Sequence, residues 1–335
     1  MPTDVSYASV STQPSLETLV LHMLPSIGLT GDGILNTNGL TAALNMKGAK
    51  EVVDGGLEFW FGVEKEENSN FKSQGKNDDM SVNAQDPLDR LRFDPKIVTD
   101  TVVINELEKA QNKGRAAIKN FMQSLKRQAN STIKNGFNDL WWKAVPGAND
   151  PVSIPQLIPN SATTGSIGGI NRAGNKYIQH GVYATAIADI GSEAGIATLE
   201  RLRIQFAVGF STVDIIIMSE GKFANLVGYL ANNHRYRPSD KLAQLRIKGI
   251  ELGDATIVYE NTRTISSADT INASRIYGID SSSTFIKTLK DGDGVWGTEM
   301  ERHGVKLNRF VPWKWFGNLV SPNPRANWVA TNVTS

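Results

Sequence analysis

The sequence predicts an α+β fold in which helices and strands are segregated along the chain. Three observations lead to this prediction. Apolar and polar side chains alternate over residues 57–64, the period of a strand with one apolar face. Apolar side chains recur every three or four residues from 104 to 140, the period of a long amphipathic helix. Strands then dominate the last hundred residues, after two further helical segments.

The composition is that of a globular protein that can bury a core. The 335 residues include 40% hydrophobic and 21% charged side chains, and the 35 lysines and arginines exceed the 34 acidic residues by one. A net charge of +1 lacks the basic excess of a dedicated nucleic-acid binder. Cysteine is absent, which excludes disulfides, thiol nucleophiles and thiolate zinc sites. No stretch reaches the ~18 apolar residues of a membrane span, so we expect no membrane association.

Residues 1–54 are predicted to form an N-terminal arm. The first 13 residues are rich in serine and threonine and lack the basic region and apolar stretch of a secretory signal, so we expect synthesis in the cytoplasm. Up to about residue 45, glycine and proline interrupt short apolar pieces, which prevents long helices and strands. Such a segment is expected to lie on another surface.

Residues 55–85 are predicted to form an extended β-hairpin. Four apolar side chains lie on one face of its first strand: Leu57, Phe59, Phe61 and Val63. Residues 64–79 are too polar to enter a core and are expected at the hairpin tip. The return strand is expected to begin at residues 80–82.

The apolar period predicts a long helix from about Ile104 that could run to Lys143. No proline interrupts residues 96–145, and at ~1.5 Å per residue the helix would be roughly 60 Å long. Gly114 and Gly136 are weak points at which it could bend. Its outward side is basic, and the counter-charge is expected from nucleic acid, from the acidic segment 64–67 of a second subunit, or from solvent alone.

The rest of the chain alternates irregular and regular segments. Four prolines and a glycine-rich stretch at 165–172 predict a long connection between residues 146 and 179. Helices are predicted at 196–206 and 220–236, and strands at 213–218, 245–250, 255–260, 275–279 and 284–289. The tail is predicted to form short strands at 307–311 and 317–320. Its three tryptophans are expected to be buried: Trp313, Trp315 and Trp328.

The sequence offers little chemistry, and we predict no catalytic residue, no cofactor and no metal site. The four histidines are not spaced as metal ligands, and no nucleophile elbow or carboxylate pair stands out. Residues 292–297 match the dinucleotide fingerprint, but they have no following βαβ unit. Residues 291–302 imitate a calcium loop without its final glutamate, and residues 169–176 are a near miss for a phosphate loop.

Seven residues are candidates for contacts between subunits, because aromatic and charged side chains often anchor interfaces. They are Phe59, Trp60, Phe61, Glu66, Glu67, Arg235 and Arg237. Two alternatives stay open. Phe59 and Phe61 could pack on their own subunit. The basic and aromatic cluster at 234–238 could be a solvated helix end.

Two short motifs and the order of elements resemble one protein family. The motifs are Ile167-Gly-Gly-Ile-Asn-Arg172, after the long helix, and Leu319-Val-Ser-Pro-Asn-Pro-Arg325, near the carboxyl end. Both are similar to segments of the major capsid (coat) proteins of tailed double-stranded-DNA bacteriophages, which share the Hong Kong 97-like fold. The order of arm, extended hairpin, long helix and α+β region is also similar, and it covers nearly the whole chain.

The resemblance implies a division into domains. It assigns 1–54 to the N-terminal arm, 55–85 to the extended loop, 86–180 to a peripheral domain with a spine helix at about 101–143, 181–306 to an axial domain, and 307–335 to a return to the peripheral domain. The family's covalent cross-link joins a lysine to an asparagine, and neither residue can be matched here. We therefore expect a non-covalent shell.

The resemblance implies a structural role and excludes enzymatic activity. Copies of the chain would form hexamers and pentamers of an icosahedral head, located in the virion after synthesis in the bacterial host cytoplasm. Expected partners are a separate scaffolding protein, a portal, a cement or decoration protein, and packaged DNA held by weak non-specific contacts. The alternative is a soluble enzyme or carbohydrate-binding module with a pocket near Gly165–Arg172.

Overall fold

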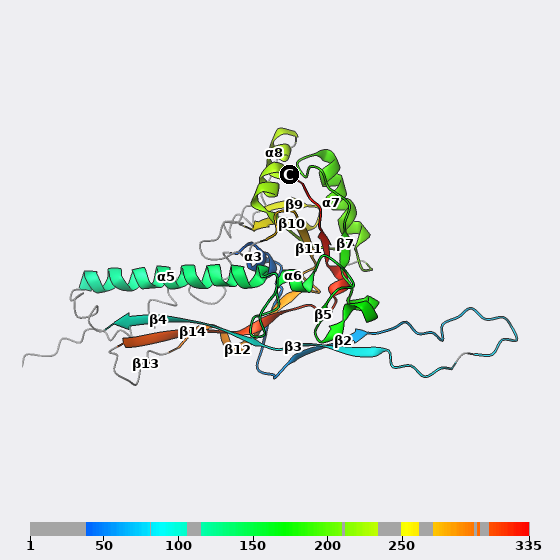
Figure 1. The fold of residues 1–335 in the computed structure, drawn as a ribbon, viewed down its shortest axis with the longest axis horizontal. Coiled ribbons are helices and arrows are strands. Elements are labelled where there is room, and N and C mark those ends of the chain that lie inside the picture. The colour runs from blue at the N-terminus through cyan, green and yellow to red at the C-terminus, as the bar shows by residue number, and fades with distance from the viewer. Residues whose placement is uncertain are drawn as a thin grey trace, which may run out of the picture.

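The computed structural model describes residues 38–80, 82–105, 115–209, 212–233, 249–260, 271–297, 300–301 and 308–334. One part of the molecule is a sheet flanked by two helices, and a second part is a sheet beneath one long helix (Figure 1). A thin ribbon projects away from both, on the side opposite to the long helix. The sequence prediction of an α+β fold is confirmed.

The first sheet has six strands in the order β7-β15-β11-β8-β10-β9. They are β7 (Gly181–Tyr183), β15 (Trp328–Ala330), β11 (Ile276–Ile279), β8 (Ile215–Ser219), β10 (Ala255–Glu260) and β9 (Gly249–Leu252). The central strand β8 is buried at every position, because helices α7 (Glu193–Gln205) and α8 (Glu220–Asn233) accompany this sheet. The predicted helices and buried strand are confirmed here within three residues, while residues 234–236 lie outside the described part.

The second sheet is built around β14 (Asn308–Val320), which pairs with β12 (Phe285–Trp296), β13 (Met300–Glu301) and β4 (Lys96–Asn105). β1 (Lys50–Val53) adds a parallel edge strand to β12. The prediction of two short tail strands is wrong, because one strand continues through Pro312. At that residue the neighbour changes from β12 to β13, and the Pro312 carbonyl still accepts from the Gly297 amide at 2.7 Å although proline has no N–H to return the bond.

The long helix α5 (Arg115–Trp142) packs on this sheet through aromatic side chains. The ring of Phe137 lies edge-on to Trp313 and Trp315, at 5.8 and 5.0 Å between centroids. The predicted burial of Trp313, Trp315 and Trp328 is confirmed, since each is 0% exposed. The helix passes through Gly136 without a break.

The predicted start of the long helix at residue 101 is wrong. Residues 101–105 belong to strand β4, and residues 106–114 lie outside the described part. The physical reason is that seven of the eight residues from Ile97 to Ile104 are β-branched, which favours an extended backbone, and that ten residue pairs join β4 to β14.

Part of the predicted N-terminal arm belongs to the body. Helix α3 (Gly39–Met46) buries Leu40 and Leu44, and β1 joins the second sheet. Asn38 makes no side-chain cap at the start of α3. Instead the Glu260 carboxylate accepts from the Leu40 amide at 3.1 Å. A cap supplied from 220 positions away explains why local sequence did not reveal this helix.

Short elements fill the long connection. They are α6 (Ile154–Leu157), β5 (Ser166–Ile167), β6 (Ile170–Asn171), and two 3-10 turns, η1 (Arg172–Gly174) and η2 (Lys176–Ile178). A third 3-10 turn, η3 (Pro324–Ala326), lies in the carboxyl-terminal motif and packs near η2. No helix in the described part of the chain is long and apolar enough to cross a membrane.

Candidate assembly surface

The projecting ribbon consists of β2 (Phe59–Glu64) and β3 (Leu88–Phe93), paired antiparallel from Phe59↔Phe93 to Glu64↔Leu88. The return strand was predicted at 80–82 and is found at 88–93, so that prediction is wrong. The inward face of the ribbon buries four side chains in its own chain: Phe59, Val63, Leu91 and Phe93.

Of the three aromatic candidates for subunit contacts, two pack within the chain. Phe59 is 3% exposed, and the ring of Phe61 lies edge-on to Phe93 and Phe285. This favours the alternative that Phe59 and Phe61 stabilise their own subunit. Trp60 points the other way and is 63% exposed. Because side chains alternate between the two faces of a strand, Phe59 and Phe61 face their own subunit, whereas Trp60 faces outward, where a second copy can reach it.

Beyond the ladder the chain continues as a thin open loop. The last backbone bond joins the Lys65 amide to the Pro87 carbonyl at 2.8 Å. Farther out, Asn70 and Asn83 exchange two hydrogen bonds, at 2.8 and 2.9 Å, and the side chains of Gln85 and Ser69 also bond to each other. Side-chain bonds therefore hold the two sides of this loop together, which explains how it extends without a continuous ladder.

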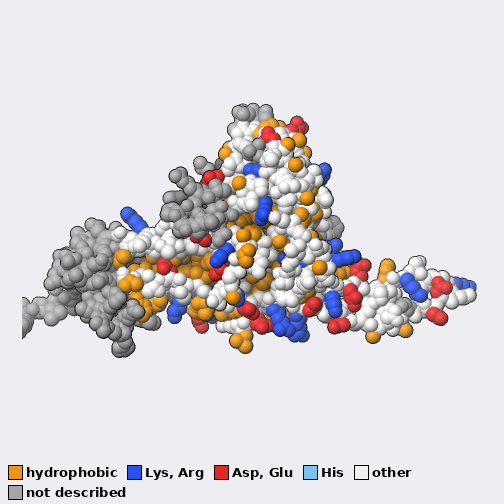
Figure 2. Space-filling model, viewed as in Figure 1, with side chains coloured by type: hydrophobic (Ala, Val, Ile, Leu, Met, Phe, Trp, Pro, Cys, Tyr) orange, Lys and Arg blue, Asp and Glu red, His pale blue; other side chains and the backbone are white. Residues whose placement is uncertain are grey.

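The ribbon and its loop carry large apolar side chains with no covering. Six of them are 63–94% exposed: Leu57, Trp60, Phe71, Met80, Val82 and Leu88. Glu66 and Glu67 are exposed as well. Figure 2 shows charged side chains of both signs along the loop and around the ribbon root, which is the part of β2 and β3 that joins the rest of the molecule. So many large apolar groups exposed on one projecting element are a mark of an interaction surface.

The ribbon root is fixed by the first of the two motifs. The Arg92 amide donates to the Gly168 carbonyl at 3.0 Å, so the turn between β5 and β6 lies against β3. Gly168 has φ +56°, and a Cβ there would lie 2.9 Å from the Arg92 nitrogen, so both the backbone and the close approach require glycine. On the other strand, the Asn175 amide group donates to the Glu64 carbonyl at 3.1 Å.

Arg172, the last residue of that motif, is a buried cation. Its side chain is 0% exposed and donates to the carbonyls of Ile178, Gln156 and Leu157, at 3.1, 3.3 and 2.6 Å. Burial lowers the pKa of Arg172 to about 10, so it stays charged at neutral pH. These bonds tie three turns of the connection to one another directly behind the ribbon root.

His180 completes this cluster as a neutral ring. Arg172 donates to its Nδ1 at 3.1 Å, because a guanidinium has no acceptor, and Nε2 then carries the proton and donates to the Pro159 carbonyl at 2.5 Å. Burial, and then the neighbouring Arg172 charge, lower the pKa of His180 to about 4. Sequence reasoning missed this residue, because an isolated histidine has no local pattern.

The depressed pKa predicts acid sensitivity. Since the pKa is about 4 in the folded state and 6.5 in the unfolded chain, only the unfolded state binds a proton between these values. The free energy of unfolding should therefore fall by about 3 kcal/mol as the pH drops from 6.5 to 4, at 1.36 kcal/mol per pKa unit. Urea titrations of the protein and of His180→Gln test this. Glutamine can keep both hydrogen bonds without titrating, so its curve should lack this component, and parallel curves would contradict the prediction.

The second motif lies at the same root. Ser321 and Pro324 are buried, and the Arg325 guanidinium lies 5.8 Å from the ring centroid of Tyr177 on η2. Just beyond the motif, buried Asn327 donates to Thr284 and Pro324 and accepts from the Asp280 amide. The two motifs are about 150 residues apart in sequence, and both contribute contacts near the root of the ribbon.

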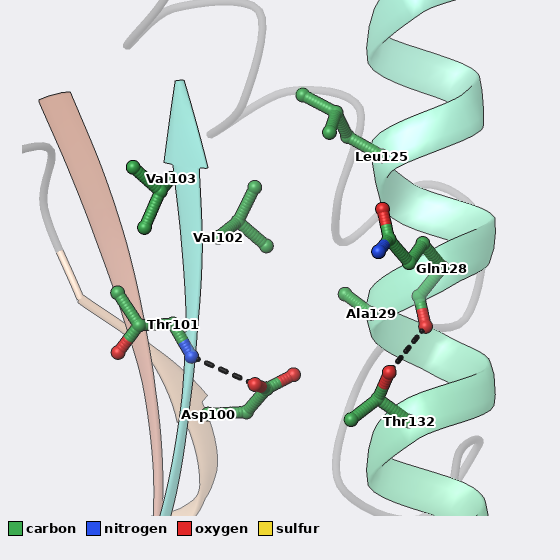
Figure 3. A pocket seen from close by; sticks show the side chains of 8 residues that line it. All are labelled: Asp100, Thr101, Val102, Val103, Leu125, Gln128, Ala129 and Thr132. Atoms are coloured by element: carbon green, nitrogen blue, oxygen red, sulfur yellow. Dashed lines mark hydrogen bonds between the residues drawn. The ribbon is translucent and has the colours of Figure 1, made fainter. Parts of the chain in front are cut away.

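The alternative enzyme prediction placed a pocket near Gly165–Arg172. There Gly168 lies against Arg92 and Leu91 and the Arg172 side chain is held by hydrogen bonds, whereas Gly165 and Gly169 face open space. A cavity of about 240 Å³ lies elsewhere, between β4 and α5 (Figure 3). Its lining is valine, leucine and alanine, with Asp100, Gln128 and two threonines. In the described part of the chain, no three His, Asp or Glu side chains are grouped to hold a metal ion.

The outer face of the second sheet is also partly apolar. Ile97 and Val103 on β4 are 66% and 51% exposed, and Val295 on β12 is 46% exposed. The aromatic contacts with α5 lie on the other face. Arg235 and Arg237, the remaining sequence candidates, lie outside the described residues.

Neither a protein-family model nor a curated protein sequence matches this chain. Solved structures do. The chain is similar to the capsid asymmetric unit of cyanophage A-1(L), with a TM-score of 0.63 at 10% identity over 88% of this chain and 92% of that chain. It is similar to the capsid of a native GTA particle, with 0.53 at 11% over 87% and 91%. It is also similar to the Mycobacterium phage Bobi structure, with 0.53 at 10% over 87% and 90%. The predicted Hong Kong 97-like fold is confirmed.

Proposed function

We propose that this chain is the major capsid protein of a tailed double-stranded-DNA bacteriophage. Many copies assemble through non-covalent contacts into an icosahedral head that encloses the genome. The observation that carries this proposal is the projecting ribbon and loop, which expose six large apolar side chains that a single copy leaves uncovered. A capsid fold over most of the chain supports the same role.

The proposal assigns each part of the chain a place in the subunit. Residues 55–85 and the return strand β3 form the extended loop, and α5 is the spine helix above the peripheral sheet. Within residues 181–306, the six-stranded sheet with α7 and α8 forms the core of the axial domain, while β12 and β13 belong to the peripheral sheet. The carboxyl-terminal residues 307–335 link the two, since β14 belongs to the peripheral sheet and β15 to the axial one.

In this proposal the subunit has no catalytic role. Hexamers and pentamers of the chain build the shell, and the mature location is the virion, after synthesis in the host cytoplasm. A separate scaffolding protein, a portal and a decoration protein are the expected protein partners. DNA contact is weak and independent of sequence, as a net charge of +1 suggests.

Assembly is tested by expressing the chain in bacteria, alone and with the neighbouring genes of its source genome, and examining purified fractions. We expect closed particles in negative-stain micrographs and a fast-sedimenting species. A species that remains monomeric or forms only a small oligomer under every salt condition and with every co-expressed gene would contradict the proposal.

A further inference from the structure

Two arginines on the ribbon have no acidic partner among the described residues of their own chain. Arg90 and Arg92 lie on the outward face of β3, and both are exposed. The ion pairs of the described residues involve neither of them. An unpaired guanidinium pair on a projecting element leaves room for carboxylates from outside.

The exposed indole of Trp60 accompanies these two charges on the same face of the ribbon. Trp60 is paired with Arg92 in the ribbon register, and the Arg90 guanidinium lies 5.4 Å from the centre of its ring. The three side chains define the basic face of the ribbon: Trp60, Arg90 and Arg92. Tryptophan and arginine are the residue types that most often dominate the binding energy of an interface.

The same chain carries a segment of opposite charge. Glu64, Glu66 and Glu67 are exposed, and none of them forms an ion pair with another described residue. This acidic segment, residues 64–67, begins at the end of β2 and enters the loop. Phe71 follows four residues later and is 92% exposed, so an apolar side chain accompanies the carboxylates.

A single copy does not bring these two surfaces together. The register places Glu64 opposite Leu88, two residues from the Gly62↔Arg90 pair and four from the Trp60↔Arg92 pair. At ~3.3 Å per residue these separations are about 7 and 13 Å along the ribbon, and Glu66 and Glu67 lie beyond the end of the ladder. Arg90 contacts Trp60 and forms no ion pair with Glu64.

We propose that the basic face of the ribbon, Trp60 with Arg90 and Arg92, binds the acidic segment 64–67 of a second copy. This inference rests on the proposed function, because it names the partner of the projecting ribbon. The two surfaces consist of different residues, so the contact is heterologous. A heterologous contact can repeat from copy to copy and close into a ring.

A DNA phosphate is the competing occupant, since arginine pairs with phosphate as well as with carboxylate. The second copy is favoured because the complementary charges are present in this same chain, exposed and unpaired. Binding of a second copy and binding of DNA lead to different expected results when the charges of the basic face and of the acidic segment are both reversed.

The test compares charge-reversed variants of the full chain by particle yield. Arg90→Glu with Arg92→Glu, and separately Glu66→Arg with Glu67→Arg, should each lower the yield of shells at least tenfold. The chain with all four substitutions should recover to within about threefold of the unchanged protein. An equal mixture of the two double variants should also associate, because each supplies the surface that the other needs.

Controls separate this contact from net charge, folding and DNA. Lys72→Glu with Lys76→Glu changes the charge of the same loop equally and should leave the yield within threefold. Circular dichroism verifies folding. Arg90→Gln with Arg92→Gln replaces the reversed arginine variant if it fails to fold, and Glu66→Gln with Glu67→Gln replaces the reversed glutamate variant. Normal shells from both double variants would overturn the inference while leaving the proposed function intact, and so would a loss that the fourfold variant does not rescue. Reduced DNA content in shells of normal yield would assign the basic face to DNA instead.

Discussion

Removing residues 66–86 should leave a folded subunit that no longer forms closed shells. Within its own chain the loop makes mostly side-chain bonds across itself, and its large apolar residues are exposed. The body therefore loses little when the loop is removed. The shell loses contacts at every subunit, and interface anchors each worth about 2 kcal/mol correspond to roughly 30-fold weaker association per contact.

The structure fixes where the cut belongs. The Lys65 amide and the Pro87 carbonyl form the last backbone bond, so a two-residue Asn-Gly turn between these residues preserves the ladder. A shorter loop costs less closure entropy, so the free energy of unfolding should stay the same or rise by about 1–2 kcal/mol. Urea denaturation measures the stability, and sedimentation with electron microscopy measures the assembly.

A matched variant separates loop length from loop chemistry. Phe71, Met80 and Val82 are 76–92% exposed and can be changed to serine without removing any contact in the core. If the apolar side chains bind a neighbour, this triple variant should lose most of its particles while it keeps the full loop. Normal particles from the deletion would contradict the role of the ribbon.

Local patterns were sufficient where a segment's own residues decide its structure. The alternation at 57–64 gave the first ribbon strand, and the apolar run at 213–218 gave the buried central strand β8. The three tail tryptophans were correctly placed in the core from their size alone. In each case the apolar pattern of the segment itself predicts which of its faces are buried.

Sequence reasoning failed where a distant partner decides the structure. Residues 101–105 continue an apolar period that suits a helix, yet they pair with β14, two hundred residues away. Helix α3 is capped by Glu260, and Pro312 is tolerated within β14 because its neighbours change there. The glycine-rich motif was identified from the sequence, but its role could not be predicted. Glycine is required at position 168 because the backbone there approaches Arg92 and Leu91, which are distant in sequence.

Replacing Arg172 should destabilise the subunit by about 3–5 kcal/mol, the usual cost of removing one partner from a buried charged cluster. Arg172→Ala leaves the carbonyls of Ile178, Gln156 and Leu157 and the Nδ1 of His180 without their shared donor, and it leaves a cavity at a site that is 0% exposed. The bonds to Ile178, Leu157 and His180 are buried, so water replaces the lost donor poorly there.

Arg172→Lys distinguishes the charge from the geometry. Lysine keeps the cation but has one nitrogen, so it cannot reach carbonyls on both sides of the fork as the two guanidinium nitrogens do. It should therefore recover only part of the loss, and urea denaturation of the three proteins gives the order. Stability of the alanine variant within about 1 kcal/mol of the unchanged protein would refute this account.

Arg172→Lys should affect assembly as well as stability. Arg172 holds the turns that follow the Gly168 contact with Arg92, so loosening them frees the root from which the ribbon projects. When a ribbon with a loose root binds a neighbouring subunit, it loses conformational entropy. A ribbon that is already fixed does not pay this cost on binding. Arg172→Lys should then form fewer particles even under conditions where nearly all of it is folded. Full particle yield from that folded variant would mean that the cluster stabilises the body without orienting the ribbon.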